Sequence, residues 1–310
     1  MQATVDSEFV HEAFLYAGDD DFLAGTVPFI IEGVEAGEPV MVAVSERKID
    51  LLRSALEGPD DSVLFVDMGR VGNPARILPA WHDFLAARAP GHRPVRGIGE
   101  PIGPDRSPAA LLECQRHEVL LNAAFATRPA WWLLCPYNTG ALRPDVVDEA
   151  ERSHRFLLEH GEHRSSTGFD MCDPAGFALP LPEPTTPADV LRFAHDGLAR
   201  VRRFVTDASA RRGLHPARLP DLLVAVNELA TNSVCHGGGA GTVRVWQEGD
   251  AVVCEITDAG FITDPLIGRR RPDAYREGGR GLWIVNQLCD LVELRSSPAG
   301  TVVRMHLSRV

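Results

Sequence analysis

The sequence predicts two domains of different fold class, a parallel-sheet α/β domain followed by an α+β sandwich. The chain has 310 residues, about twice the length of a typical domain. Short apolar runs alternate with helical stretches in the first half, whereas the second half begins with two helices and continues mainly as hairpins. Residues 173–187 contain five prolines, which favour extended geometry and exclude a helix or a central strand. We therefore expect domains over 1–172 and 188–310, joined by a linker over 173–187.

Five short apolar runs in the first half predict strands that are covered on both faces. Their residues are 13–16, 40–44, 63–66, 94–98 and 131–135. Helical spacing of apolar residues marks the segments between them, at 21–33, 73–88 and 108–125. This alternation of strands and helices predicts a parallel sheet.

The second half has a different order of elements. Two helices are expected at about 188–212 and 219–236, followed by a hairpin over 242–258 that turns at Gly249-Asp250. A helix at about 279–289 and a final hairpin over 291–307 complete the pattern. Helices would then cover one face of an antiparallel sheet.

The charge of the chain limits its partners. The formal net charge is -12 at pH 7, and an acidic chain repels the nucleic-acid backbone, so no direct nucleic-acid binding is expected. The charge is uneven, because 188–310 has 16 Arg and 14 acidic residues (+2), which leaves -14 upstream. Lys48 is the only lysine, and the preference for Arg is typical of a GC-rich, bacterial genome.

The location and redox state follow from what the sequence lacks. No run approaches the ~18 apolar residues of a membrane span, and the first residues do not resemble a signal peptide. The six cysteines are at least 19 residues apart, so no CxxC-type metal pair exists. We expect buried thiols in a reducing cytoplasm, and no contact with a membrane.

Polar side chains follow one stripe of the helix expected over 219–236. Glu228, Asn232 and His236 are spaced i, i+4, i+8, so they share a face. A carboxamide oxygen suits Mg²⁺, and a carboxylate one turn away can orient a water or accept a hydroxyl proton. A solvated helix face is the ordinary alternative. The packing side of the same helix would consist of Leu219, Leu222, Val226, Leu229, Ala230 and Ser233.

Two further groups follow along the chain. Asp258 ends a strand, where its carboxylate can accept a hydrogen bond from an exocyclic amine, and Gly260 lets a ring approach the backbone. Gly278, Gly279 and Gly281 precede a helix, whose free amides can hold phosphates. Tight turns are the alternative in both places.

Taken together, NELATNSVCHG, DAG, GGRGLWIV and GTVVRMHL resemble the N, G1 and G2 boxes and the terminal adenine-contacting strand of the GHKL (Bergerat-fold) ATPase superfamily. The region is most similar to the anti-sigma factor serine/threonine kinases. The resemblance implies ATP and Mg²⁺ as cofactors, with Glu228 as the base near the acceptor hydroxyl, Asn232 as the Mg²⁺ ligand and Asp258 on the adenine amino group. It implies further that Gly260 lets adenine approach, that Gly278, Gly279 and Gly281 cradle phosphate, and that Thr301 contacts adenine.

The same resemblance implies an ATP lid over 262–277 that contains Arg269-Arg270-Arg271. These arginines would meet phosphates or a partner protein, and a solvated charge run is the alternative. The chain reads NSVCHG where the superfamily commonly has NAxxHA. A module that binds ATP without phosphotransfer is therefore a second hypothesis.

A sensor histidine kinase is a third hypothesis, because His195-Asp196 resembles a phosphoacceptor box. Only 37 residues separate His195 from Asn232, too few for a two-helix dimerisation hairpin before the ATPase fold. We therefore interpret His195 as a surface residue on the first helix of the second domain.

The loop after the first strand, GDDDFLAG, invites comparison with a P-loop. It has three aspartates and no lysine, so carboxylates would repel a triphosphate and Walker-type ATP binding is not expected. Lys48 is interpreted as a surface residue at a helix start.

Three segments of the first half, 19–45, 99–125 and 131–154, resemble the MEDS (methanogen/methylotroph, DcmR sensory) domain. The resemblance implies a RecA-like α/β fold that senses an unknown ligand. Ligands of open parallel sheets bind outside the carboxyl ends of the strands. Those ends supply Asp19, Ser45, Asp67, Glu100, Cys135 and Tyr137, with Asn138 and His154 as possible neighbours, and a structural role is the alternative for each.

The leading hypothesis is a cytoplasmic bacterial signalling regulator. Its sensory half would control an ATP-dependent anti-sigma factor serine/threonine kinase. By family resemblance alone, the partners would be a sigma factor, an anti-anti-sigma antagonist protein or both, and the chain would be able to form a homodimer.

Overall fold

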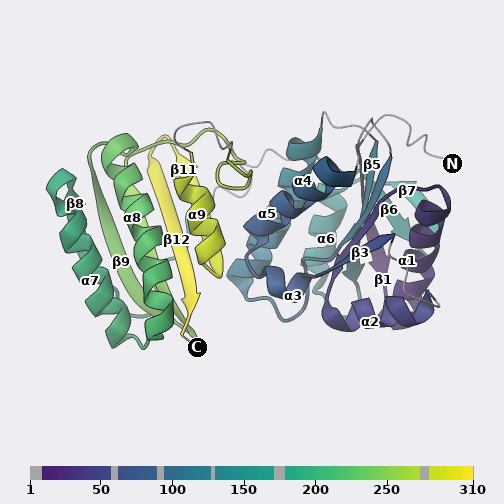
Figure 1. Cartoon of the computed structure of the whole chain (residues 1–310), viewed down its shortest axis with the longest axis horizontal. Coiled ribbons are helices and arrows are strands. Elements are labelled where there is room, and N and C mark those ends of the chain that lie inside the picture. Colours follow the sequence, from purple (N-terminus) through teal and green to yellow (C-terminus); the bar gives the residue numbers. More distant parts are fainter. Residues whose placement is uncertain are drawn as a thin grey trace. The chain divides into compact units, whose positions relative to one another are not determined.

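The computed structural model describes residues 9–56, 62–88, 94–126, 130–170, 179–272 and 279–309. The chain divides into two compact units, Met1–Pro174 and Ala175–Val310, whose elements are labelled in Figure 1.

The described strands of the first unit form a seven-stranded sheet in the order β3-β2-β4-β5-β1-β6-β7. All neighbouring strands are parallel except the antiparallel pair β6-β7, so the predicted parallel sheet is confirmed. The strands are β1 (Phe9–Tyr16), β2 (Val40–Val44), β3 (Val63–Asp67), β4 (Val95–Gly99), β5 (Trp131–Asn138), β6 (Phe156–Glu159) and β7 (Glu162–Ser165).

The edge pair β6-β7 was not predicted from the sequence. Each of the two strands has four residues, and β7 reads EHRS and is exposed along its whole length. A strand without a buried face carries no apolar alternation. It forms here because its backbone completes the ladder of β6 at the edge of the sheet.

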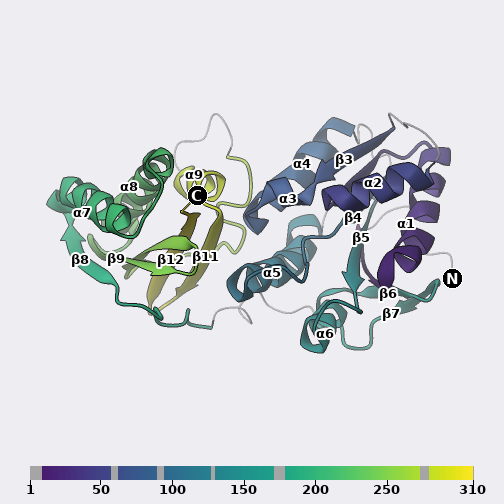
Figure 2. The ribbon, with the colours of Figure 1, turned by 90° about the horizontal axis from the view of Figure 1, so that it is seen from below.

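Helices cover both faces of this sheet, as Figures 1 and 2 show. The side of α1 and α2 holds a cluster of buried residues that includes Phe14, Phe22 and Leu52. On the other side Trp81 of α4 lies against Gly97 of β4, where a Cβ atom would come within 2.8 Å of the indole. The helices are α1 (Gly18–Glu35), α2 (Glu46–Ala55), α3 (Met68–Val71), α4 (Ile77–Arg88), α5 (Pro108–Phe125) and α6 (Pro144–Ser153).

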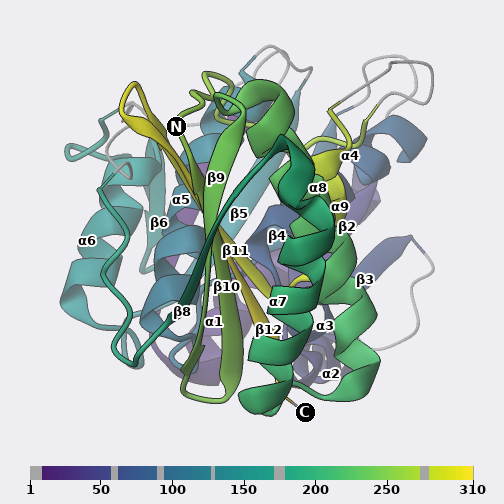
Figure 3. The ribbon, with the colours of Figure 1, turned by 90° about the vertical axis from the view of Figure 1, so that its left-hand side faces the viewer.

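The second unit is an antiparallel sheet with helices on one face, which confirms the predicted α+β class (Figures 2 and 3). Its described strands follow the order β11-β12-β10-β9-β8, and α7 and α8 run side by side across them (Figure 3). The elements are β8 (Asp189–Ala194), α7 (Leu198–Arg211), α8 (Leu219–His236), β9 (Ala240–Glu248), β10 (Ala251–Asp258), α9 (Gly281–Leu288), β11 (Leu291–Ser297) and β12 (Gly300–Ser308).

The start of the first helix of this unit was predicted wrongly. Residues 189–194 form the edge strand β8, which pairs with β9, and α7 begins only at Leu198. Burial alternates along β8, with Leu191 and Phe193 turned to the core, but the exposed positions include the apolar Val190, so the sequence itself shows no clear apolar alternation. Pairing with β9 therefore decides the structure of this segment, and the local apolar spacing does not.

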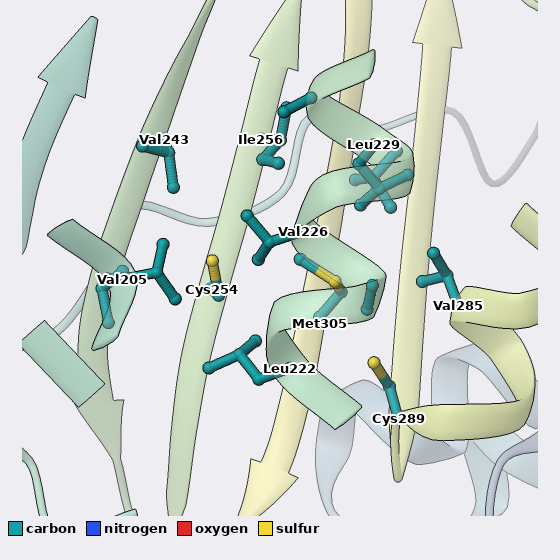
Figure 4. Packing of buried hydrophobic residues seen from close by; sticks show 14 of the residues in the cluster. Val205, Leu222, Val226, Leu229, Val243, Cys254, Ile256, Val285, Cys289 and Met305 are labelled. Carbon is teal, nitrogen blue, oxygen red and sulfur yellow. The ribbon is translucent and has the colours of Figure 1, made fainter. Parts of the chain in front are cut away.

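The core of the second unit lies between α8 and the sheet, as Figure 4 shows. Leu222, Val226 and Leu229 of α8 are at most 3% exposed and pack with residues such as Cys254 and Met305. The packing side predicted for this helix therefore faces the sheet.

Charged side chains are buried on β10 and β12, next to a half-buried arginine of β9. Glu255 is 1% exposed and lies between two arginines, with Arg244 Nε 2.8 Å from Oε1 and Arg304 Nε 2.9 Å from Oε2. The proline-rich segment contributes to this cluster, because the Pro182 carbonyl accepts a hydrogen bond from Arg304 and Glu183 pairs with Arg244. Its described part, 179–187, contains neither helix nor strand and belongs to the second unit.

Four of the described cysteines are buried, namely Cys114, Cys135, Cys254 and Cys289, whereas Cys235 is exposed. The expectation of buried thiols therefore fails for Cys235, which lies on the outer side of α8. Cys172 falls outside the described residues. None of the described helices is both long and apolar enough to span a bilayer.

The first testable prediction concerns Glu255. Glu255→Ala leaves two arginines without their shared carboxylate, and breaking a buried ion pair from one side costs about 3–5 kcal/mol. We expect urea denaturation to show a loss of unfolding free energy of this size. Asp250→Ala, in the exposed turn between β9 and β10, should change it by less than about 0.5 kcal/mol. Equal losses in the two variants would contradict the assigned role of Glu255.

Candidate functional site

A pocket in the second unit lies between α8, α9 and the ends of β10 and β12. It is lined by Leu229, Asn232, His236, Gly237, Ile256, Asp258, Gly260, Phe261, Ile262, Leu282, Thr301 and Val303. Four of the residues singled out in the sequence, Asn232, Asp258, Gly260 and Thr301, therefore lie around one hollow. The lining combines apolar side chains such as Leu229 and Ile256 with polar groups such as Asn232 and Asp258.

The carboxylate of Asp258 is fixed by two hydrogen bonds. Ser233 Oγ donates to Oδ2 at 2.6 Å, and the amide of Gly260 donates to Oδ1 at 2.8 Å. Each oxygen of a carboxylate accepts two hydrogen bonds, so both retain acceptor capacity. Thr301 lies opposite Asp258 in the ladder of β10 and β12, and its hydroxyl donates to the Gly260 carbonyl at 2.8 Å.

Gly237 and Gly260 provide the space that this arrangement needs. A Cβ atom at Gly237 would come within 2.4 Å of the Asp258 carboxyl carbon. At Gly260 it would come within 2.9 Å of the same carboxylate and within 3.1 Å of Gly237 Cα. The backbone after α8 and the backbone after β10 therefore touch beneath the pocket.

The predicted polar stripe of α8 faces the start of α9. Glu228 and Asn232 are half-buried, and a Cβ atom at Gly281 would lie 3.1 Å from Glu228 Oε2 and 3.0 Å from Asn232 Nδ2. Gly281 is the first residue of α9, and the side chain of the N-cap residue, Arg280, makes no capping hydrogen bond to this helix. These amides are available to an anion, which helix N-termini commonly bind.

The other glycines and the lid region are partly described. Gly279 is exposed with φ of 76°, and Gly278 lies outside the described residues. The lid expected over 262–277 is described as far as residue 272, without a helix or strand. Arg269 is 5% exposed, whereas Arg270 and Arg271 are exposed, so the three arginines do not form one solvated run.

Sequence reasoning missed two residues of this site. Ser233 was assigned to the packing side of the helix, and it is buried as expected, but its hydroxyl holds Asp258. Gly237 follows the stripe as part of NSVCHG, and only the approach of β10 makes its missing side chain significant. In the sequence, the small polar residue directly after Asn232 was the signal that could have pointed to Ser233.

His195 is exposed, as expected, but it does not lie on the first helix of the second unit. It begins a short 3-10 turn, His195–Gly197, between β8 and α7.

The first unit has a pocket of about 410 Å³ at the carboxyl ends of its strands. Three of the eight residues expected there line it, namely Ser45, Glu100 and Asn138. Asp19 makes two hydrogen bonds with Arg47, a lining residue, and these lower the pKa of the Asp19 carboxyl. Asp67 caps α3 by accepting from the amide of Gly69, which also lines the pocket.

Lys48 is buried, contrary to the prediction of a surface residue. It lies in the first turn of α2, and its ammonium contacts the Tyr16 hydroxyl and donates to Glu100 Oε2 at 2.6 Å. Tyr16 ends β1 and Glu100 follows β4, so strands far apart in sequence form this cluster. Burial raises the pKa of the Glu100 carboxyl and Lys48 opposes this rise, while burial and Glu100 together raise the pKa of the Tyr16 hydroxyl.

The remaining candidates of the first unit lie in its interior. Tyr137 packs edge-on against His154, and Cys135 and His154 meet His11 and Glu118 in a fully buried group. Burial, together with the Glu118 charge, raises the pKa of the Cys135 thiol, and burial lowers that of His154 to about 4. The expected residues therefore separate into a pocket set and a buried set.

Comparisons with known proteins cover both units. Residues 10–155 match the family model of the MEDS (MEthanogen/methylotroph, DcmR Sensory) domain, and residues 192–307 match that of the histidine kinase-like ATPase domain. Among solved structures, the chain is similar to the RsbU and RsbW domains of Rv1364c from Mycobacterium tuberculosis, with 18% identity and a TM-score of 0.31. That match covers 40% of this chain and only 32% of the other. No curated protein matches.

The two family matches agree with the two units and with the two fold classes described above. The chain therefore joins a domain of the MEDS sensory family to a domain of the histidine kinase-like ATPase family.

Proposed function

We propose that the second unit binds ATP with Mg²⁺ and transfers the γ-phosphoryl group to a serine or threonine of a partner protein, under the control of the sensory unit. The observation that carries this proposal is the position of Asn232, which lines the pocket together with Asp258 and Gly260 and also lies with Glu228 beside Gly281. The match to the histidine kinase-like ATPase family supports the ATP-binding part.

The adenine ring would lie in the pocket that Asp258 lines. Leu229, Ile256 and Val303 offer apolar contacts to a flat ring, and the free acceptor positions of Asp258 suit an exocyclic amine. The hydrogen bond from Thr301 to the Gly260 carbonyl holds the turn against which the ring would lie.

The phosphates would lie at the start of α9. The uncapped amides there and the dipole of the helix favour an anion, and Gly281 leaves room between this terminus and α8. Asn232 would hold Mg²⁺ through its carboxamide oxygen, and the bound ion would neutralise phosphate charge. Gly281 has no Cβ atom, and this leaves space for the ion beside Asn232.

Glu228 lies one helical turn before Asn232 and faces the same space. Its half-buried carboxylate would orient the acceptor hydroxyl and accept its proton. The hydroxyl would come from a separate protein, since the segment between His195 and Asn232 holds α7 and the first part of α8 but no additional two-helix hairpin.

We assign the partner to the anti-sigma type, that is, a sigma factor, an anti-anti-sigma antagonist or both. The support is the approach to the N box through α7 and the exposed Arg270 and Arg271, which suit an acidic protein surface. The unidentified ligand of the sensory unit would bind in the pocket around Tyr16, Lys48 and Glu100.

The second prediction concerns ATP affinity. Asp258→Asn replaces an acceptor-only carboxylate by an amide that must also serve Ser233 and the Gly260 amide. A hydrogen bond to a charged group contributes about 1.5–3 kcal/mol, so the Kd for ATP should rise by about 10- to 100-fold in calorimetric titrations. Asp250→Asn is the control and should bind as the parent does. An unchanged Kd in Asp258→Asn would remove the adenine site from this pocket.

The third prediction separates transfer from binding. Glu228→Gln should lower the rate of phosphotransfer to an antagonist protein by about 10²- to 10⁴-fold while the Kd for ATP stays within about twofold. Labelled ATP and candidate antagonists from the source cell provide the assay. Asp221→Asn, which removes a carboxylate from the first turn of the same helix, should keep the parental rate.

The outcome with the parent chain distinguishes the hypotheses. Serine- or threonine-linked label that disappears in Glu228→Gln supports the kinase. ATP binding without label on any antagonist would identify an ATP-binding module instead, and acid-labile label on His195 would identify a histidine kinase.

A further inference from the structure

We propose that the sensory unit holds a Zn²⁺ ion between His11, Glu118, Cys135 and His154. Their four ligand atoms lie within 4.8 Å of one another, and all four residues are at most 3% exposed. The proposal concerns the interior of the first unit and does not depend on the function proposed for the second.

The four residues come from different parts of the fold. His11 lies on β1 and Cys135 on the neighbouring β5, whose register places both side chains on the same face of the sheet. Glu118 lies on α5, which packs on this face, and His154 directly follows α6. The site would therefore join two strands and two helices.

The spacing of the ligand atoms fits a tetrahedral ion. Glu118 Oε2 is 3.1 Å from His11 Nε2, 3.4 Å from Cys135 Sγ and 3.5 Å from His154 Nε2, and Sγ is 3.3 Å from His11 Nε2. With bonds of 2.0–2.3 Å to zinc, the ligands of a tetrahedral site are about 3.3–3.8 Å apart. Four of the six separations thus lie in or near this range, and the two between His154 and the other ligands His11 and Cys135 are at most 4.8 Å.

Hydrogen bonds fix the tautomer of His11. The amide nitrogen of Asn122 donates to the carbonyl of Ser153 at 2.8 Å, which orients the Asn122 side chain. Its oxygen therefore faces His11 Nδ1 at 3.0 Å, and Nδ1 must carry the proton. The lone pair of a neutral His11 is then on Nε2, which faces Glu118 and Cys135.

His154 has the same arrangement. Its Nδ1 lies 2.9 Å from the carbonyl of Ala150 and donates to it, which leaves the lone pair on Nε2. His154 Nε2 is buried and makes no hydrogen bond. Zinc-binding histidines typically donate their second N–H to a carbonyl or carboxylate, as both histidines do here.

Charge balance favours a dication over an empty cluster. Two imidazole lone pairs face a carboxylate that accepts a hydrogen bond from the weak S–H donor of Cys135, in the interior, where poorly satisfied acceptors are costly. Zn²⁺ with a Cys135 thiolate, the Glu118 carboxylate and two neutral imidazoles has no net charge. Four protein ligands leave no open position, so the ion would be structural and would cross-link the strands to α5 and α6.

The fourth prediction tests this site on the full chain. After equilibration with Zn²⁺ and removal of unbound metal, elemental analysis should find about one zinc per chain. Co²⁺ in its place should give the intense visible bands of a tetrahedral site and a thiolate charge-transfer band in the near ultraviolet. Cys135→Ser should lose the charge-transfer band, and His154→Ala should reduce bound zinc at least tenfold.

Two controls keep the test decisive. Cys114→Ser replaces a buried thiol of α5 that is not a proposed ligand, and this variant should retain zinc and the cobalt bands. Asn122→Ala removes no proposed ligand but takes away the hydrogen-bond partner of His11 and of the Ser153 carbonyl, and it should weaken zinc affinity by about 10- to 100-fold. If a ligand variant does not fold, the parent chain still provides a test, because Zn²⁺ should raise its Tm in a concentration-dependent manner.

The proposal is overturned if the folded parent chain binds neither Zn²⁺ nor Co²⁺ and shows no shift of Tm. It is also overturned if Cys135→Ser keeps the cobalt charge-transfer band. The four side chains would then form a hydrogen-bonded network that contains protons and no metal.

Discussion

Leu222, Val226 and Leu229 hold α8 against the five-stranded sheet, and the candidate nucleotide site depends on this contact. Once these side chains are buried, the pitch of the helix sets Glu228 and Asn232 on a different face, toward α9. Ser233, buried on the sheet side, reaches Asp258 at the end of β10. One packed helix therefore positions both ends of the candidate site, at Asp258 and at Gly281, and a shift of α8 would displace all of these groups together.

In the sensory unit, too, the packing of apolar layers determines where polar side chains lie. Its central strands are buried by helices on both faces, so polar side chains are concentrated at the ends of strands, where Tyr16, Lys48 and Glu100 meet. His11, Glu118, Cys135 and His154 depart from this arrangement, since they form a polar group inside an apolar layer. Such a group is costly unless its members satisfy one another or share an ion.

Much of the fold could be predicted because its signals are local. The apolar runs of β1 to β5 and the turn at Gly249-Asp250 indicate their own structure, and the order of elements then gives the class of each sheet. Asp258, Gly260 and Thr301 could be grouped only through a family resemblance, and the structure brings them together. The strands β7 and β8 escaped prediction because pairing with a neighbour, not their own pattern, determines them.

The remaining differences have the same physical origin. Whether Lys48 is buried depends on Tyr16 and Glu100, which lie 32 and 52 positions away in the chain. Lys48 is also the only lysine among the 310 residues, and it is 8% exposed. Amine-directed reagents would thus find a single side-chain target in this sequence, located in the wall of the sensory pocket. The rate at which Lys48 is acylated would therefore change when a ligand enters the pocket or when the pocket opens. No label would have to be introduced to measure this rate.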